Sequence, residues 1–249
     1  MRLNWVKLCT AFSLFTTACV MHAPPVGAQQ PQVDLALVLA VDISASVDDG
    51  EAGIQREGYV AALRDPRVVE AIRSGVTGRI ALTYVERSGP TDQNQLIMWR
   101  EISDAASAQA FADELQKAPY TPGYTTSISG GIDFCVQLLH TSGINAARRV
   151  IDVSGDGYSD RGRDIRSSRD DAVKQGIVIN GLPLMNPRPA YRAAIPSDLD
   201  TYYAKNVTGG RGSFTLVVRK LEDFNRLVLR KLLLEIAENH ATALINKPS

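Results

Sequence analysis

The chain has 249 residues, of which 45% are apolar and 22% are charged, and its 27 Lys and Arg residues balance 27 Asp and Glu residues. This composition argues against a disordered chain, a collagen-like repeat and a disulfide-rich scaffold. The charge balance argues against a protein that coats nucleic acid, because such proteins carry an excess of basic side chains. With only three histidines and three cysteines, His-rich metal sites and zinc clusters are nearly excluded, and oxygen atoms are the ligands left for a metal.

Residues 1–28 have the pattern of a secretory signal peptide. Two basic residues precede an apolar stretch from Leu8 to Met21, and small residues follow up to Ala28, where we expect cleavage. The stretch is shorter than the ~20 apolar residues that a membrane span needs, so a retained anchor is the weaker interpretation. Lipid attachment at Cys19 is another alternative, disfavoured by Thr16 at a position that normally carries a large aliphatic residue. We therefore predict export to the periplasm or secretion.

After a leader over residues 29–32, the chain alternates between predicted strands and helices. Nearly continuous aliphatic runs predict six buried strands, over Val33 to Val41, Arg79 to Val85, Leu96 to Trp99, Arg149 to Val153, Ile177 to Leu182 and Ser213 to Val218. Helical periodicity predicts helices over Asp49 to Asp65, Ser107 to Lys117, Ser127 to Leu139, Asp164 to Gln175 and Leu221 to Glu238, and a shorter one within Pro196 to Asn206.

This alternation predicts an α/β fold with a mostly parallel six-stranded sheet and helices on both of its faces. No linker divides the chain, so we expect one domain over residues 33–249, with its core at about 33–237. Four prolines in or beside the segment from Met185 to Pro196 predict an irregular surface loop there.

Oxygen-bearing side chains follow the predicted strands where those strands end. Asp42, Ser44 and Ser46 come directly after the first strand, the segment from Gly123 to Ser127 precedes a helix, and the segment from Val153 to Gly157 follows the fourth strand. The carboxyl ends of parallel strands form the crevice where ligands bind in an open α/β sheet. Hydroxyls and carboxylates without histidine or thiolate suit Mg²⁺, Mn²⁺ or Ca²⁺.

The pattern resembles the metal-ion-dependent adhesion site of the von Willebrand factor type A (vWA) domain, which reads Asp-x-Ser-x-Ser, then a distant Thr and a distant Asp. The resemblance spans nearly the whole chain after the leader, and with the leader and the segment from Tyr202 to Gly210 it points to a bacterial branch of exported vWA-like proteins. It implies a Rossmann-like three-layer fold. The implied metal ligands are Asp42, Ser44, Ser46, Thr126 and Asp156. Thr125 remains an alternative to Thr126.

In the vWA family the hydroxyls bind the metal directly, the carboxylates act mostly through water, and a glutamate or aspartate of a partner completes the metal's coordination. The resemblance thus implies an exported, divalent-cation-dependent protein-binding module. It implies no enzyme, and no catalytic residue presents itself. His140 and His240 lie at predicted helix ends, where they suit the helix dipole, and Cys135 lies on an apolar helical face that predicts a buried, inert thiol.

Two other functions stay open at this point. One is a Mg²⁺-dependent phosphoester hydrolase, and the other is an envelope scaffold that binds no metal. The five-residue Asp-x-Ser-x-Ser pattern alone would more often be a turn or a helix cap. Its occurrence together with the other two segments, in the family's order, is what favours a metal site.

Overall fold

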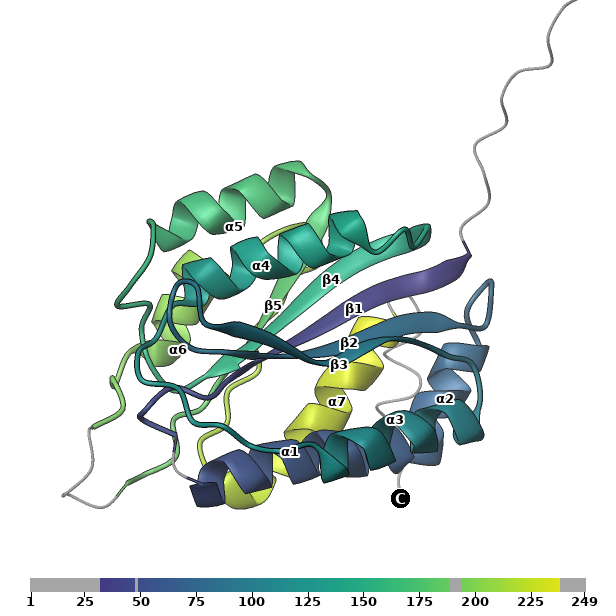
Figure 1. Ribbon diagram of the computed structural model, residues 1–249, viewed down its shortest axis with the longest axis horizontal. Coiled ribbons are helices and arrows are strands. Elements are labelled where there is room, and N and C mark those ends of the chain that lie inside the picture. The colour runs from purple at the N-terminus through teal and green to yellow at the C-terminus, as the bar shows by residue number, and fades with distance from the viewer. Residues whose placement is uncertain (1–31, 48, 189–193, 238–249) are drawn as a thin grey trace, which may run out of the picture.

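The computed structural model describes residues 32–47, 49–188 and 194–237, and Figure 1 shows their arrangement. The predicted signal peptide, most of the leader and the last residues of the predicted domain lie outside the described residues, so those boundaries stay predictions. None of the described helices combines the length and the apolar character that crossing a membrane requires.

A five-stranded, mostly parallel sheet forms the middle of the molecule. Its strands are β1 (Val33–Asp42), β2 (Ile80–Arg87), β3 (Gln93–Ile102), β4 (Ala146–Gly155) and β5 (Ile177–Pro183). They lie in the order β3-β2-β1-β4-β5, with β3 antiparallel to β2 and the other neighbours parallel. β1 is buried almost throughout because both faces of the sheet are covered, which explains its nearly continuous aliphatic run.

The prediction of a sixth strand over Ser213 to Val218 is wrong. That segment runs beside β5 but forms only isolated bridges, from Thr215 to Gly181 of β5 and from Val218 to Leu184, the residue after β5. The outer edge of β5 forms hydrogen bonds with two different segments. Ile179 pairs with Gly209, and Gly181 pairs with the segment from Ser213 to Val218. In addition, β5 ends in Pro183, which has no N–H to extend a hydrogen-bond ladder.

Helices cover both faces of the sheet. They are α1 (Asp49–Arg64), α2 (Pro66–Arg73), α3 (Ala105–Lys117), α4 (Ile128–Thr141), α5 (Ile165–Lys174), α6 (Leu199–Tyr202) and α7 (Phe224–Ile236), with a π-helical turn η1 (Tyr203–Val207) and a 3₁₀ turn η2 (Leu221–Asp223). The predicted helices are all present, and α2 is one that was not predicted. Its signal is the Asp65-Pro66 pair: the Asp65 side chain accepts a hydrogen bond from Arg67 N, and Pro66 opens the helix.

The molecule therefore has three layers, as Figure 1 shows. α1, α2, α3 and α7 cover one face of the sheet, while α4, α5 and α6 cover the other. Successive residues of β1 serve the two layers in turn, because side chains alternate along a strand: Leu37 packs in the core beside α1 and α7, and Val38 packs in the core beside α4. The predicted α/β class is confirmed. Cys135 of α4 is fully buried, and burial raises the pKa of its thiol to about 12. A thiol with such a pKa stays protonated and is therefore inert.

Candidate metal centre

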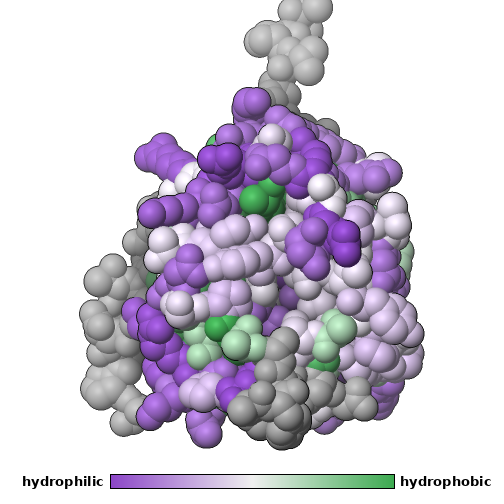
Figure 2. Space-filling model, turned by 90° about the vertical axis from the view of Figure 1, so that its left-hand side faces the viewer, coloured by the Kyte–Doolittle hydropathy of each residue, from purple (hydrophilic) through white to green (hydrophobic). Residues whose placement is uncertain are grey.

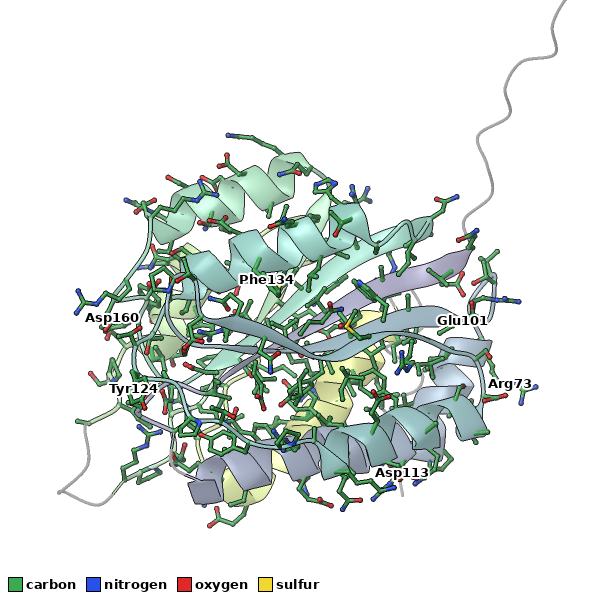
Figure 3. All side chains as sticks on the ribbon, viewed as in Figure 1. Arg73, Glu101, Asp113, Tyr124, Phe134 and Asp160 are labelled. Carbon is green, nitrogen blue, oxygen red and sulfur yellow. The ribbon has the colours of Figure 1, made fainter. Side chains whose placement is uncertain are left out.

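The predicted site lies at the edge of the sheet where the parallel strands end. Asp42 is the last residue of β1, and Asp156 directly follows β4, the neighbouring parallel strand. The segment before α4 is fixed to the same edge, because Gly123 N donates to Ile43 O at 2.7 Å. Figure 3 shows Tyr124 of this segment and Asp160 of the loop after β4 on the same side of the molecule.

Four of the five predicted ligands form a connected group, which we call the oxygen cluster (Asp42, Ser44, Ser46 and Asp156). Ser44 N donates to Asp42 Oδ1 at 2.9 Å, and the hydroxyls of Ser44 and Ser46 lie 3.1 Å apart. Ser46 Oγ donates to Asp156 Oδ1 at 2.6 Å, which joins two segments 110 residues apart in the sequence. The Asp-x-Ser-x-Ser segment thus folds back on itself after β1 and presents its oxygens to Asp156.

Thr126 belongs to the segment that Gly123 fixes to this sheet edge, and its own backbone hydrogen bonds go to the loop after β4. Its N–H donates to Asp160 Oδ1 at 3.1 Å, and its carbonyl accepts from Asp160 N and Arg161 N. The hydroxyl of the alternative, Thr125, lies 2.9 Å from the position that a Cβ would take on Gly89. Among the described contacts, neither hydroxyl bonds to the oxygen cluster, so the choice between the two threonines stays open.

A buried arginine lies beneath Asp42. Arg87 ends β2 opposite Asp42 in the strand register, and its Nη2 lies 3.7 Å from Asp42 Oδ2 and donates to Ser154 O at 2.7 Å. Glycine is required beside the pair, since a Cβ on Gly155 would lie 2.6 Å from Arg87 Nη2 and 2.7 Å from Asp42 Oδ2, and one on Gly131 would lie 2.6 Å from Arg87 Cδ. Burial raises the pKa of Asp42; Arg87 opposes this shift, and the charge of Asp156 adds to it.

A second arginine contacts the oxygen cluster from its outer side. The Arg188 guanidinium forms an ion pair with Asp156 and a two-pronged pair with Glu51 of α1, at 3.2 Å for Nε–Oε1 and 3.0 Å for Nη2–Oε2. Asn186 Nδ2 donates to the same Glu51 carboxylate at 3.1 Å. The surface-loop prediction for Met185 to Pro196 is therefore wrong at Asn186 and Arg188, whose exposed fractions are 6% and, for the side chain, 5%. Burial of the Arg188 charge is tolerated because the carboxylates of Glu51 and Asp156 pair with it.

The residues present fit a hard divalent cation. Two carboxylates and two hydroxyls converge, which is the donor chemistry of Mg²⁺, Mn²⁺ and Ca²⁺ sites. Asp42 Oδ2 is buried and accepts no hydrogen bond from the described residues, although buried carboxylate oxygens are normally satisfied. The described residues contain no group of three or more His, Cys, Asp or Glu side chains placed to hold a metal. Any metal here would therefore depend on the serine hydroxyls.

Comparison with known proteins places the chain in a family. The family model described as "Protein of unknown function (DUF1194)" matches residues 32–240. The chain belongs to this family. No curated protein sequence is significantly similar to it.

Solved structures show the fold of this DUF1194 protein. A von Willebrand factor type A protein from Catenulispora acidiphila superposes with a TM-score of 0.57 at 9% identity, over 82% of this chain and 43% of that one. Proximal thread matrix protein 1 from the mussel byssus, with a zinc-occupied MIDAS motif, gives 0.56 at 11% identity, over 82% and 46%. Manganese-loaded TRAP protein from Plasmodium vivax gives 0.53 at 15% identity, over 83% and 74%.

The chain has the vWA fold. At these identities the likeness shows the fold alone, and the chain spans only 43–49% of the first solved chains that it matches. The comparisons therefore establish the vWA fold of the described residues. What this DUF1194 protein binds has to be argued from its own residues.

Sequence reasoning missed three charged residues of the site: Glu51, Arg87 and Arg188. Arg87 had a signal, because it lies two residues after the predicted strand Arg79 to Val85 and so stands near the same sheet edge as Asp42. Arg188 had none. It lies 32 residues beyond Asp156, in a proline-rich segment whose course no periodicity defines.

Proposed function

We propose that this DUF1194 protein is an exported, divalent-cation-dependent protein-binding module of the adhesion type. Asp42, Ser44, Ser46, Thr126 and Asp156 would hold the metal. The observation that carries this proposal is the oxygen cluster, in which the Ser44 N–H and the hydroxyls of Ser44 and Ser46 connect the carboxylates at two neighbouring strand ends, beside the unsatisfied Asp42 Oδ2. When bound, Mg²⁺, Mn²⁺ or Ca²⁺ would supply an open coordination position for a carboxylate of the partner.

The metal-loaded relatives support this proposal. The byssus protein carries zinc in its MIDAS motif, and the TRAP protein is manganese-loaded. The sequence pattern of that motif is the one on which the present assignment rests.

The surface around the oxygen cluster suits a protein partner. Figure 2 looks onto the sheet edge that carries the site and shows a mainly hydrophilic face with small apolar patches. Tyr124 is 86% exposed and Tyr158 37% exposed, and they come from the two loops that adjoin the cluster. Exposed aromatic side chains often anchor protein interfaces. We propose that the partner supplies a Glu or Asp carboxylate to the metal and apolar surface to the tyrosines, which would add specificity that one carboxylate lacks.

The enzyme alternative is not favoured by the site. Two residues after Asp42, where a phosphoryl-transfer site of this layout would place a second carboxylate, the chain carries Ser44. Ser44 bonds to Ser46 rather than to a base. We therefore propose no catalytic role for these residues.

Titration with Mn²⁺ and Mg²⁺ by calorimetry tests the metal site. We expect saturable 1:1 binding to the native chain and at least a 100-fold loss of affinity in Asp42→Asn, because that substitution removes a carboxylate but keeps the side-chain shape. Asp113→Asn on the exposed surface of α3 is the matched control and should bind as the native chain does. Equal affinity in the native chain and Asp42→Asn would contradict the assignment.

A further inference from the structure

The carboxylate of Asp156 is shared between the proposed metal site and an arginine. Its Oδ1 accepts from Ser46 at 2.6 Å, and its Oδ2 contacts the Arg188 guanidinium. The Asp156 side chain is fully buried in this arrangement. A divalent cation bound to the oxygen cluster would therefore meet a positive charge already on one of its carboxylates.

We propose that Arg188 is a tethered competitor of the divalent cation. Its guanidinium neutralises Asp156 when no metal is bound, and it has to give up Asp156 when a metal binds. This inference rests on the proposed function, because it concerns regulation of the same metal site. It assigns to Arg188 the task of holding metal affinity down until a partner contributes its own negative charge.

Arg188 has a second partner that allows it to leave Asp156. The Glu51 carboxylate accepts hydrogen bonds from Nε and Nη2 of Arg188 and another from Asn186 Nδ2. A cleft of about 850 Å³ adjoins this group and is lined by Glu51, Asn186, Arg188 and residues of the η2 turn. The guanidinium can therefore turn away from Asp156 while it keeps a carboxylate, so its charge is never left unpaired in a buried place.

The other arginine of the site cannot serve in this way. Arg87 is fully buried within the sheet edge, and the absence of side chains on Gly131 and Gly155 is what makes room for it. Its charge is a permanent part of the site beneath Asp42. Arg188 is the arginine with an adjoining cleft, so competition with a metal falls to it.

The charges explain why a partner would relieve this competition. Asp42, Asp156 and Glu51 carry three negative charges, and Arg87 and Arg188 carry two positive charges, which leaves one net negative charge for a divalent ion. A carboxylate from a partner adds a second. Metal and partner should therefore strengthen each other's binding, a coupling that is reciprocal by thermodynamic necessity.

The experiment compares Mn²⁺ affinity, by calorimetry, in the native chain, Arg188→Gln, Arg188→Lys and Arg163→Gln. Arg163 is the matched control, because it also bridges two carboxylates, Asp133 of α4 and Asp171 of α5, but its side chain is 43% exposed. We expect Arg188→Gln to bind Mn²⁺ at least tenfold more tightly than the native chain. Arg188→Lys keeps the charge and should stay within about threefold, and Arg163→Gln should not change.

Melting temperatures over the same Mn²⁺ range give a second measurement. Arg188→Gln should melt lower than the native chain without metal and gain more from Mn²⁺, since metal binding to the folded state raises its stability. This measurement also gives an affinity if the variant needs metal to fold.

Two outcomes would overturn the inference in distinguishable ways. Equal or weaker Mn²⁺ binding in folded Arg188→Gln would leave the metal site standing and refute the competition. Absence of Mn²⁺ binding in the native chain and in Arg188→Gln alike would refute the proposed metal site, and the competition with it.

Discussion

Two groups of buried charges lie at different places, one at the ends of β1 and β4 and the other between the sheet and α7, and they are built differently. The first is the oxygen cluster with its arginines. The second, which we call the core charge cluster, consists of Asp152 of β4, Asn180 of β5, and Lys231 and Glu235 of α7. Lys231 Nζ lies 2.7 Å from Asp152 Oδ1 and also contacts Glu235, and Asn180 Nδ2 donates to Glu235 Oε1 at 3.0 Å.

The difference lies in what surrounds each group. Every member of the core charge cluster belongs to a helix or strand and is almost fully buried, and Lys231 also lies 5.3 Å from the centre of the Phe214 ring. In the oxygen cluster, Ser44 and Ser46 belong to the loop after β1, and Arg188, which pairs with Asp156, belongs to another loop. The core charge cluster has no such loop, whereas we propose that the oxygen cluster exchanges Arg188 for a divalent cation. Burial of a charged group does not by itself identify a binding site. A loop beside the charged group, through which a ligand can reach it, is also needed.

Lys231→Met should have the largest effect on stability of the variants considered. It leaves the carboxylates of Asp152 and Glu235 buried without a counter-charge, and breaking a buried ion pair in this way costs about 3–5 kcal/mol. Urea denaturation measures the loss. Lys174→Met is the control, because its ammonium is 75% exposed beside Asp171 and its removal should change the free energy of unfolding by less than about 0.5 kcal/mol. If Mn²⁺ restored the stability of Lys231→Met, the core charge cluster would not be closed.

Arg87→Met should come next. The variant leaves Asp42 without its counter-charge, but the two groups lie 3.7 Å apart and form no direct hydrogen bond, so we expect a loss of about 2–4 kcal/mol, somewhat below that of Lys231→Met. Saturating Mn²⁺ should recover much of it, since a divalent ion on Asp42 replaces the missing charge. Parallel urea titrations with Mn²⁺ and with EDTA measure the recovery. No recovery would mean that Asp42 faces no metal.

The fold was largely predictable because its signals are local. An aliphatic run such as Val33 to Val41 can be buried on both faces only in a central strand, and the helices between such runs follow from periodicity. The segment from Ser213 to Val218 has strand composition but no continuous neighbour to pair with, which composition does not reveal. α2 was not predicted, although Asp65 and Pro66 are typical of a helix start. The helix has only eight residues, which is too few to show a clear helical periodicity.

The grouping of the carboxylates and hydroxyls at one sheet edge was predictable, and the contacts of the arginines with them were not. Asp42 and Asp156 follow strand ends, and topology alone brings the ends of neighbouring parallel strands together. The pairing of Arg87 with Asp42 depends on the register between β1 and β2, which the sequence does not specify. Arg188 reaches Asp156 only through the course of a proline-rich loop.

Glu235→Gln should have the smallest effect at acidic pH and reveals the core charge cluster by its pH dependence. Burial raises the pKa of Glu235 from 4.5 to about 7, against the opposing influence of Lys231. Below pH 4.5 the carboxyl is protonated in the folded and the unfolded chain. Between about pH 4.5 and 7 the folded chain keeps a proton that the unfolded chain has lost, so this group's contribution to stability falls as the pH rises.

Urea titrations from pH 5 to pH 8 should therefore show a shallower fall in stability for Glu235→Gln than for the native chain. Glu114→Gln on the exposed side of α3 should follow the native curve. Mn²⁺ should shift the native and Glu235→Gln curves upward by the same amount at each pH, because the core charge cluster packs between the sheet and α7, whereas the oxygen cluster lies at the ends of β1 and β4. A Mn²⁺ effect that depended on Glu235 would instead mean that the two buried groups communicate through β4, which carries Asp152 and leads into Asp156.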